Sequence, residues 1–339
     1  AQEQCRKKRR NRQIENAKFE HVFFFSLRLF TMKASHSPHH HASPLMATLA
    51  SLSVGDSAPV RVMAVLNVSP ESFYQGSVHT DIERLAIAAQ AMASAGADII
   101  DIGAMSTAPY LKTQISEEEE TERLARAVAA IAPHISLPIS ADTKRAKPAA
   151  AALAAGAHII NDVSGLKYDP AMAHLIAESG AGAILMASEV TPSAGSPLRR
   201  TRAALVASVQ LATQANIPRE HIVLDPGIGF FRQPEVPWYE WDCAVLRDLA
   251  SLRTLGFPLL VGVSRKSFIG KILNQPQATD RLIGSLACAA IAVNNSAHII
   301  RAHDIKETVE TVRMTEQLRP HWSTRTDRLE QGTDSLRPK

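Results

Sequence analysis

The chain has 339 residues, of which 45% are hydrophobic and 21% charged, as in a globular protein with a large core. No apolar run reaches the roughly 18–20 residues that a membrane-spanning helix needs, so we expect no membrane association. The net charge of +4 comes from residues 1–46, which carry +6 against −2 for the rest. The main part of the chain thus has no cationic excess, and we expect no nucleic-acid partner.

The first 46 residues have no regular hydrophobic pattern. The run "CRKKRRNR", from Cys5 to Arg12, is compatible with a nucleic-acid or localisation patch, but a disordered or non-native leader explains it more simply. The three cysteines, Cys5, Cys243 and Cys288, have neither metal-ligand spacing nor a disulfide framework. They indicate a reducing compartment, and we expect a cytoplasmic protein.

A strand-and-helix unit recurs about every 30 residues along the rest of the chain. Each unit has a short apolar run, a polar cluster and an Ala/Leu-rich helical pattern. The apolar runs predict eight strands, at residues 61–68, 97–103, 137–142, 158–163, 182–188, 222–227, 258–264 and 297–304. One helical pattern, "SEEEETERLARAVAAI", opens on Ser116, a predicted N-cap followed by acidic residues that suit the helix dipole.

The fold follows from the number and character of these strands. Strands that are apolar throughout indicate a parallel sheet covered on both faces. Eight strand–helix units predict a (β/α)₈ TIM barrel over residues 55–320, followed by a polar C-terminal tail at 321–339. The alternative is a doubly wound open sheet, which usually has fewer strands. A nucleotide-binding one would carry G-x-G-x-x-G where this chain has "NVSPES".

Polar residues follow nearly every predicted strand. The C-terminal strand ends form the active-site face of such a barrel, so these residues are expected to meet in one ring. They are Asn67, Asp101, Asp142, Asn161, Asp162, Asp225, Ser264, Arg265, Lys266, Arg301, His303 and Asp304. Each one alone is explained by a helix cap or a turn. Because buried polar groups are costly unless paired, the whole ring indicates a polar ligand.

The ring contains two kinds of chemistry. Asp142, Asn161 and Asp225 can converge on one flat heterocycle with several N–H donors. The cationic members follow the last two predicted strands, where this fold commonly binds phosphate: Arg265, Lys266, Arg301 and His303. Arginine and lysine at this corner predict a phosphate or diphosphate group.

Six motifs, in order, resemble the dihydropteroate synthase family over residues 60–318: "LNVSPESF", "GADIIDIG", "GAHIINDVSG", "LDPGIGF", "GVSRKSFIG" and "RAHD". The resemblance implies a transferase of folate biosynthesis. Such an enzyme joins 6-hydroxymethyl-7,8-dihydropterin diphosphate to the amine of p-aminobenzoate and releases diphosphate.

The resemblance also implies residue roles. Four residues would hold the pterin ring: Asp142, Asn161, Asp225 and Lys266. Asn67 would help a Mg²⁺ ion bind the diphosphate, whose oxygens Thr107, Arg301 and His303 would also reach. Ser267 would border the aminobenzoate pocket. Lys266, Arg301, His303 and Asn67 are accordingly the predicted catalytic residues, since metal and cations stabilise the leaving diphosphate while the aniline attacks.

The loops depart from the family pattern. Gln75 stands where the family usually has Asp, and Met105 and Ala108 stand where it has Glu and Arg. The fifth predicted strand ends in Ser188 instead of His. Joint loss of the loop Asp and Arg suggests a variant branch resembling the methanopterin-pathway type, with a ribosylated aminobenzene as acceptor. The acceptor's phosphate would then meet basic residues such as Lys112, Arg199 or Arg200.

Two other functions are compatible with the sequence. A pterin-binding methyltransferase barrel would keep the Asp and Asn contacts, but it does not need the anion corner of Lys266, Arg301 and His303. A non-catalytic paralogue that binds pterin would tolerate the altered loops. A homodimer is compatible with the resemblance, but no sequence feature decides the oligomeric state.

Overall fold

The structure is a computed structural model of the chain, and it describes residues 44–68, 78–104, 115–191, 194–231 and 236–319. The compact unit of the fold begins at Pro44. Within the described ranges, no helix combines the length and the apolar character that crossing a bilayer demands.

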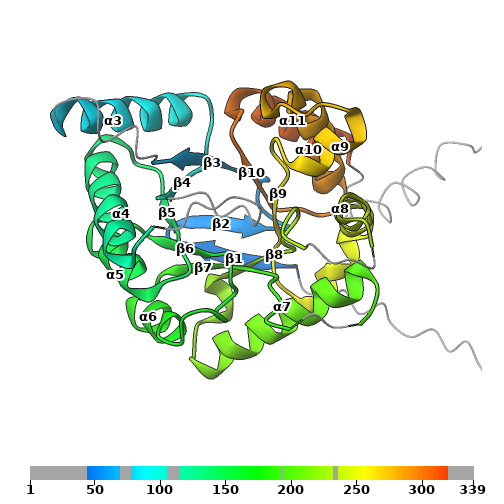
Figure 1. Ribbon diagram of the computed structural model, residues 1–339, viewed down its shortest axis with the longest axis horizontal. Helices are drawn as coiled ribbons and strands as arrows, with labels where there is room; N and C mark the ends of the chain where they lie inside the picture. The colour runs from blue at the N-terminus through cyan, green and yellow to red at the C-terminus, as the bar shows by residue number, and fades with distance from the viewer. Residues whose placement is uncertain (1–43, 69–77, 105–114, 192–193, 232–235, 320–339) are drawn as a thin grey trace, which may run out of the picture. The chain divides into compact units, whose positions relative to one another are not determined.

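Eight parallel strands form the centre of this unit (Figure 1). They are β3 (Arg61–Asn67), β4 (Ile99–Gly103), β5 (Ile139–Asp142), β6 (Ile159–Asp162), β7 (Gly182–Met186), β8 (Ile222–Asp225), β9 (Leu260–Gly262) and β10 (Ile299–Ala302). Their order is β8-β7-β6-β5-β4-β3-β10-β9, and a parallel bridge between Leu224 and Leu259 joins the two outer strands. All eight predicted strands are therefore confirmed, and the sheet closes into the predicted TIM barrel rather than staying open.

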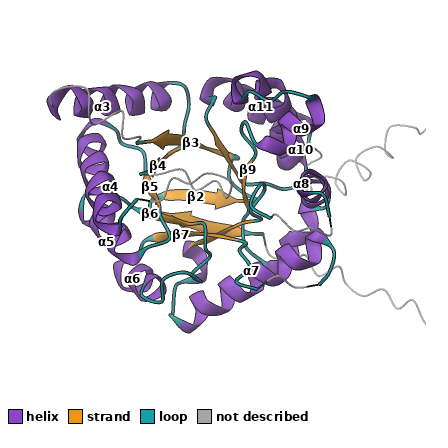
Figure 2. Ribbon diagram, in the orientation of Figure 1, coloured by secondary structure: helices purple, strands orange, loops and turns teal. Residues whose placement is uncertain are grey.

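Helices surround the strands (Figure 2). They are α3 (Val78–Ser94), α4 (Glu117–Ile131), α5 (Ala146–Ala154), α6 (Met172–Ser179), α7 (Pro197–Gln214), α8 (Trp238–Arg247), α9 (Ser267–Leu273), α10 (Leu282–Asn294) and α11 (Ile305–Leu318). Short 3₁₀ turns lie between them at η1 (Ala132–His134), η2 (Arg219–His221), η3 (Leu249–Leu255) and η4 (Ala278–Arg281). The predicted N-cap is confirmed, since Ser116 Oγ accepts a hydrogen bond from Glu119 N at 3.1 Å.

The inside of the barrel changes from apolar to polar along the strands. Near their N-terminal ends, one cluster of fully buried side chains fills the interior: Met63, Ile99, Ile159, Ile184, Val223, Leu260 and Ile299. Alternate residues of a strand point to the same face, so the residues two positions further on also point inward. Several of these are polar: Asp101, Asn161, Asp225 and Arg301. The strand period thus places the polar ring directly above an apolar base.

An antiparallel hairpin, β1 (Met46–Leu49) and β2 (Leu52–Gly55), packs against this apolar base and was not predicted. Its buried side chains are Ala47, Leu49 and Val54. The contact is close, because a Cβ on Gly182 would lie 2.8 Å from Leu49 Cδ2. Leu45 is also buried, so the compact unit starts before residue 46, where the leader was predicted to end.

Asp56, just after the hairpin, fastens it to the barrel. Its carboxylate accepts two hydrogen bonds from Arg253, at 2.7 and 2.9 Å, and one from Leu45 N at 2.8 Å. His298 Nε2 lies 3.2 Å from Asp56 Oδ1, and His298 Nδ1 accepts from Leu259 N at 3.0 Å. Because Nδ1 is an acceptor, the proton of the neutral ring is on Nε2 and points to Asp56.

Acidification is expected to destabilise the barrel through this cluster. Burial alone would raise the pKa of Asp56, but the hydrogen bonds from His298 and Arg253 hold it below its usual value. Burial lowers the pKa of His298. The unfolded chain therefore binds more protons than the native state, and stability should fall as pH decreases from about 6.5. Urea denaturation at several pH values measures this fall.

The matched variants for this experiment are Asp56→Asn and Asp248→Asn, the second at an exposed position. Asp56→Asn should lower stability at pH 7 and flatten the profile below about pH 4, where unfolding otherwise adds a proton to Asp56. Asp248→Asn should leave the profile unchanged. A profile for Asp56→Asn that is parallel to that of the parent would contradict the assignment.

Candidate active site

Three strands contribute to one buried polar cluster inside the C-terminal end of the barrel, and Arg301 on β10 completes it. Arg301 Nε donates to Asp101 Oδ2 at 2.7 Å, and Arg301 Nη2 donates to Asp142 Oδ2 at 2.8 Å. Asn161 Nδ2 donates to Asp101 Oδ2 at 3.1 Å. Asp101 is fully buried, and the Arg301 side chain is 20% exposed. The predicted convergence of β4, β5, β6 and β10 is confirmed for these residues.

Several acceptor atoms of this cluster have no partner among the described residues. They are Asp101 Oδ1, Asp142 Oδ1, Asn161 Oδ1 and the hydroxyl of Ser140. Asp225 adds a carboxylate from β8, of which Oδ1 accepts from Gly227 N at 2.8 Å. Buried acceptors without donors cost free energy, so this cluster favours a ligand that brings several N–H groups.

The charges of these carboxylates respond to their burial. Burial raises the pKa of Asp142 to about 7, although the charge of Arg301 opposes the shift. Burial also raises the pKa of Asp225, against a hydrogen bond from Gly227 and the charge of Lys266. N–H donors of a ligand would stabilise the charged form of both groups and offset this cost.

Lys266 lies in the turn after β9 and interacts with the charges of Asp142 and Asp225. Its Nζ lies 4.5 Å from the centre of the Phe230 ring. A Cβ on Gly229, where φ is +87°, would lie 3.0 Å from Lys266 Cδ, so a glycine leaves room for the lysine chain. Burial, with the charge of Arg301, lowers the pKa of Lys266 to about 8. At neutral pH Lys266 is mainly an ammonium donor beside the carboxylates.

Arg265 is not part of the anion corner, contrary to the prediction. Its guanidinium donates to both carboxylate oxygens of Asp304, at 2.9 and 2.6 Å, and to Ala278 O at 2.9 Å. Its backbone has φ of +56°, and its N–H donates to Ser285 Oγ. Arg265 and Asp304 therefore hold the turn that presents Lys266.

His303 is exposed and uncharged at neutral pH. Desolvation at the barrel mouth and the charge of Arg301 lower its pKa to about 4. Ser264 Oγ accepts from His303 N at 3.2 Å and lies 3.0 Å from His303 Nδ1. The Ser264 hydroxyl can donate to Nδ1, which leaves Nε2–H as a donor. The described cations of the predicted anion corner are thus Lys266 and Arg301, with His303 as a neutral donor.

Asn161 and Asp162 are adjacent in the sequence but have different functions in the structure. Asn161 points into the barrel, whereas the Asp162 carboxylate accepts from Ser164 N at 2.7 Å and Leu166 N at 2.8 Å. Asp162 therefore shapes its own loop and does not face the pocket. The alternation of strand side chains separates the two residues.

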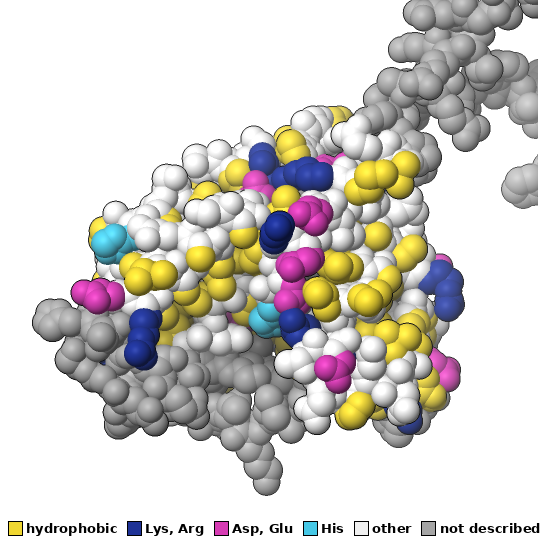
Figure 3. Space-filling view, turned by 90° about the horizontal axis from the view of Figure 1, so that it is seen from above, with side chains coloured by type: hydrophobic (Ala, Val, Ile, Leu, Met, Phe, Trp, Pro, Cys, Tyr) yellow, Lys and Arg dark blue, Asp and Glu magenta, His cyan; other side chains and the backbone are white. Residues whose placement is uncertain are grey.

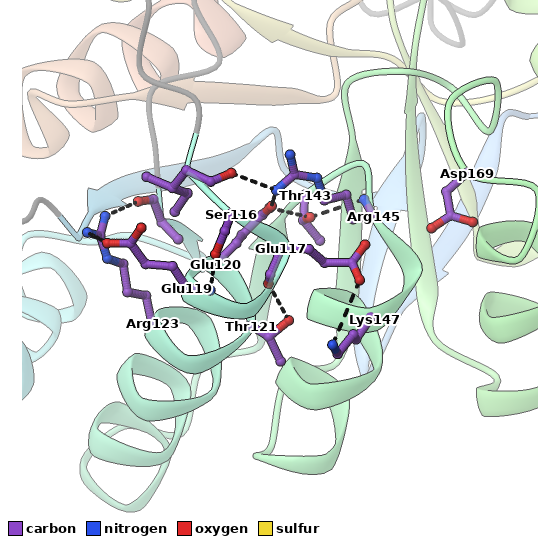
Figure 4. Close-up of polar contacts among 12 residues, drawn as sticks. Ser116, Glu117, Glu119, Glu120, Thr121, Arg123, Thr143, Arg145, Lys147 and Asp169 are labelled. Atoms are coloured by element: carbon purple, nitrogen blue, oxygen red, sulfur yellow. Dashed lines mark hydrogen bonds and ion pairs between the residues drawn. The ribbon is translucent and has the colours of Figure 1, made fainter.

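A second buried network supports the end of β5, where Asp142 lies (Figure 4). Glu120 on α4 is fully buried and accepts from Thr143 Oγ1 at 2.5 Å. Its other oxygen accepts from Arg145 Nη1 at 2.7 Å, and Arg145 Nη1 also donates to Ile115 O at 3.2 Å. Glu120 could not be told apart from its acidic neighbours in the sequence, because its burial depends on the packing of α4 against α5.

Comparison with known proteins identifies the family. Residues 63–303 match the family described as pterin binding enzyme. Dihydropteroate synthase of Synechocystis is 38% identical over 264 residues, which are 76% of this chain and 89% of the relative. Dihydropteroate synthase of Escherichia coli is 38% identical over 262 residues, which are 75% and 90%. The chain belongs to the dihydropteroate synthase family.

A solved structure supports the same conclusion. Xanthomonas albilineans dihydropteroate synthase with 4-aminobenzoic acid matches with a TM-score of 0.73 and 30% identity over 82% of this chain and 99% of that one. As a member of the dihydropteroate synthase family, the chain is an enzyme of the transferase class. The resemblance inferred from the six motifs is therefore confirmed.

The remaining residues predicted for a dihydropteroate synthase fall into two groups. Asn67 ends β3 with an exposed side chain, and Ser267 is the first residue of α9, directly after Lys266. The others lie outside the described residues: Gln75, Met105, Thr107, Ala108 and Lys112. Ser188 lies two residues beyond the end of β7.

Arg200 is not available to bind the phosphate of an acceptor substrate of this dihydropteroate synthase family member, contrary to the prediction. It is 4% exposed, and its Nε donates to Glu189 Oε1 at 3.0 Å, while Nη2 pairs with Glu189 Oε2. Its guanidinium also lies 4.8 Å from the centre of the Trp241 ring. Arg199 donates to Ala194 O at 3.0 Å. Arg200 is therefore part of the packing under α7.

On the face drawn in Figure 3, cationic and acidic side chains alternate with apolar ones and do not gather into an area of one sign. The described residues also contain no group of three or more His, Cys, Asp or Glu side chains placed to hold a metal ion.

Proposed function

We propose that the protein joins 6-hydroxymethyl-7,8-dihydropterin diphosphate to the amine of p-aminobenzoate. The observation that carries this proposal is the set of buried acceptors on Asp142, Asn161 and Asp101 that find no partner in the described part of the chain, beside the donors Lys266 and Arg301. A pterin ring offers amino and ring N–H donors along one edge. Both relatives are named dihydropteroate synthases, which agrees with this chemistry.

In the proposed reaction, the amine nitrogen forms a bond to the methylene carbon of the pterin. The carbon–oxygen bond to diphosphate breaks, its electron pair leaves on oxygen, and the amine loses a proton. Asp142, Asn161 and Asp225 would bind and orient the ring. Lys266, Arg301 and the Nε2–H of His303 would stabilise the charge that develops on the leaving group. Two of the five N–H groups of Arg301 donate to Asp101 and Asp142, and these two bonds fix the plane of the guanidinium. The other N–H groups would then donate to the ligand.

Asn67, exposed at the C-terminal end of β3, fits a Mg²⁺ ion that arrives with the substrate. Mg²⁺ commonly keeps several waters and binds through one or two protein oxygens plus substrate phosphates. The exposed Asn67 side chain can supply one such oxygen. When bound, the ion would neutralise charge on the diphosphate.

The assay for this function is amine-dependent release of diphosphate, with formation of 7,8-dihydropteroate followed in parallel. We expect turnover with p-aminobenzoate. The same purified chain without amine should release little diphosphate and serves as the control. Pterin binding without turnover would favour the non-catalytic paralogue, and turnover with a methyl donor instead would favour the methyltransferase barrel.

The acceptor is tested in the same assay by competition. The altered loops led us to expect a ribosylated aminobenzene whose phosphate would bind a basic residue such as Arg200. Arg200 is instead paired with Glu189, so this contact is not supported. We therefore propose p-aminobenzoate as the acceptor and expect its kcat/KM to exceed that of the ribosylated compound by about tenfold or more. The reverse preference would restore the variant branch. The cytoplasmic location and a homodimer stay predictions.

A further inference from the structure

Asp101 is the most buried acid of the site, and it lies at its structural centre. One oxygen, Oδ2, accepts from two side chains: Arg301 Nε at 2.7 Å and Asn161 Nδ2 at 3.1 Å. The Asp101 side chain is fully buried, in contrast to Arg301. Asp101 thus contacts two residues proposed to touch the substrate.

The Arg301 contact determines which way round the Asn161 amide lies. A guanidinium is always a donor, so the Asp101 oxygen facing it must be an acceptor. Only the NH₂ end of the Asn161 amide can then face the same oxygen. The carbonyl oxygen, Oδ1, is left on the other side, buried and without a partner among the described residues.

We propose that Asp101 is a positioning residue for Asn161. By holding the NH₂ group of the Asn161 amide, it turns the amide oxygen toward the heterocycle. The site therefore selects a ring with an amino group at that edge. This inference rests on the proposed pterin-binding function. A ring that carries a carbonyl in place of the amino group would bring two oxygens together at Asn161, and one buried acceptor would lack a donor. A mismatch of this kind is the strongest source of discrimination that a polar pocket has.

Without an acceptor at residue 101, the amide loses its fixed orientation. In Asp101→Leu, the amide can turn end for end and present NH₂ to a carbonyl. In Asp101→Asn, the Arg301 donor still demands an oxygen at the Oδ2 position, so the new amide oxygen can accept from both partners. Asp101→Asn therefore removes the charge but keeps the orientation of Asn161.

The test measures affinity by calorimetry for two rings, 6-hydroxymethylpterin and its 2-oxo analogue, with the full chain and each variant. The readout is the ratio of the two dissociation constants, which a loss of stability alone does not change. We expect the parent and Asp101→Asn to prefer the amino ring by a similar ratio. In Asp101→Leu the ratio should fall by about tenfold or more. Asp101→Leu/Asn161→Ala should show the same ratio as Asn161→Ala alone.

Each result decides a separate point. If the parent binds neither ring, the proposed function fails and not the positioning inference alone. If the parent binds the amino ring but Asp101→Leu keeps the parent's ratio, the inference is overturned. If Asp101→Asn lost the preference for the amino ring, the positioning inference would also be overturned. This variant therefore tests the inference even if the leucine variant does not fold.

Discussion

Replacement of Asp225 by alanine is expected to weaken binding of the pterin diphosphate by about 2–3 kcal/mol, or about 30- to 150-fold in dissociation constant. Asp225 is 9% exposed at the end of β8, and burial raises the pKa of its carboxyl group. A bound N–H donor would restore the charged form, so truncation removes a charge-assisted hydrogen bond. Calorimetric titration of the purified variant measures the loss.

Two companion variants make this result specific. Asp225→Asn keeps an oxygen for the Gly227 N–H and should lose less affinity than the alanine variant. Asn161→Ala should lose binding to a comparable extent, because it removes the buried Oδ1 acceptor. Circular dichroism should show the barrel intact in all three. Affinity of Asp225→Ala or Asn161→Ala within a few-fold of the parent would mean that the heterocycle is not held here.

Replacement of Leu49 by alanine is expected to lower the free energy of unfolding by about 2–5 kcal/mol, the range for a fully buried leucine. Leu49 on β1 is completely buried and packs on the apolar base of the barrel, where it approaches Gly182. The remaining residues cannot fill the cavity without moving the hairpin. Urea denaturation gives the change directly.

Met46→Ala on the same strand is the matched control, since Met46 is 40% exposed and lies on the other face. Its effect should stay within about 0.5 kcal/mol. Equal effects for the two variants would show that the hairpin does not pack on the apolar base of the barrel.

Removal of residues 1–43 should leave stability unchanged, whereas removal through Gly55 should unfold the barrel.

The sequence by itself determined the barrel and most of its ring. Eight apolar runs at a regular spacing predicted eight strands because strands buried on both faces must be apolar throughout. The positions of Asp142, Asn161 and Asp225 followed, because the C-terminal ends of parallel strands meet at one rim. The short β1–β2 hairpin was not predicted, because each of its strands has only 4 residues, too few for a hydrophobic period to be recognised.

Tertiary structure alone decided which polar groups pair with each other. Arg265 and Lys266 are adjacent cations in the sequence, yet Asp304 on the next unit binds Arg265 and leaves Lys266 for the pocket. Likewise, Asp101 became the centre of the site because Arg301, 200 positions away in the chain, donates to it. Hydrogen bonds act over about 3 Å and depend on direction. The residues that share them are therefore known only once the strands are placed side by side.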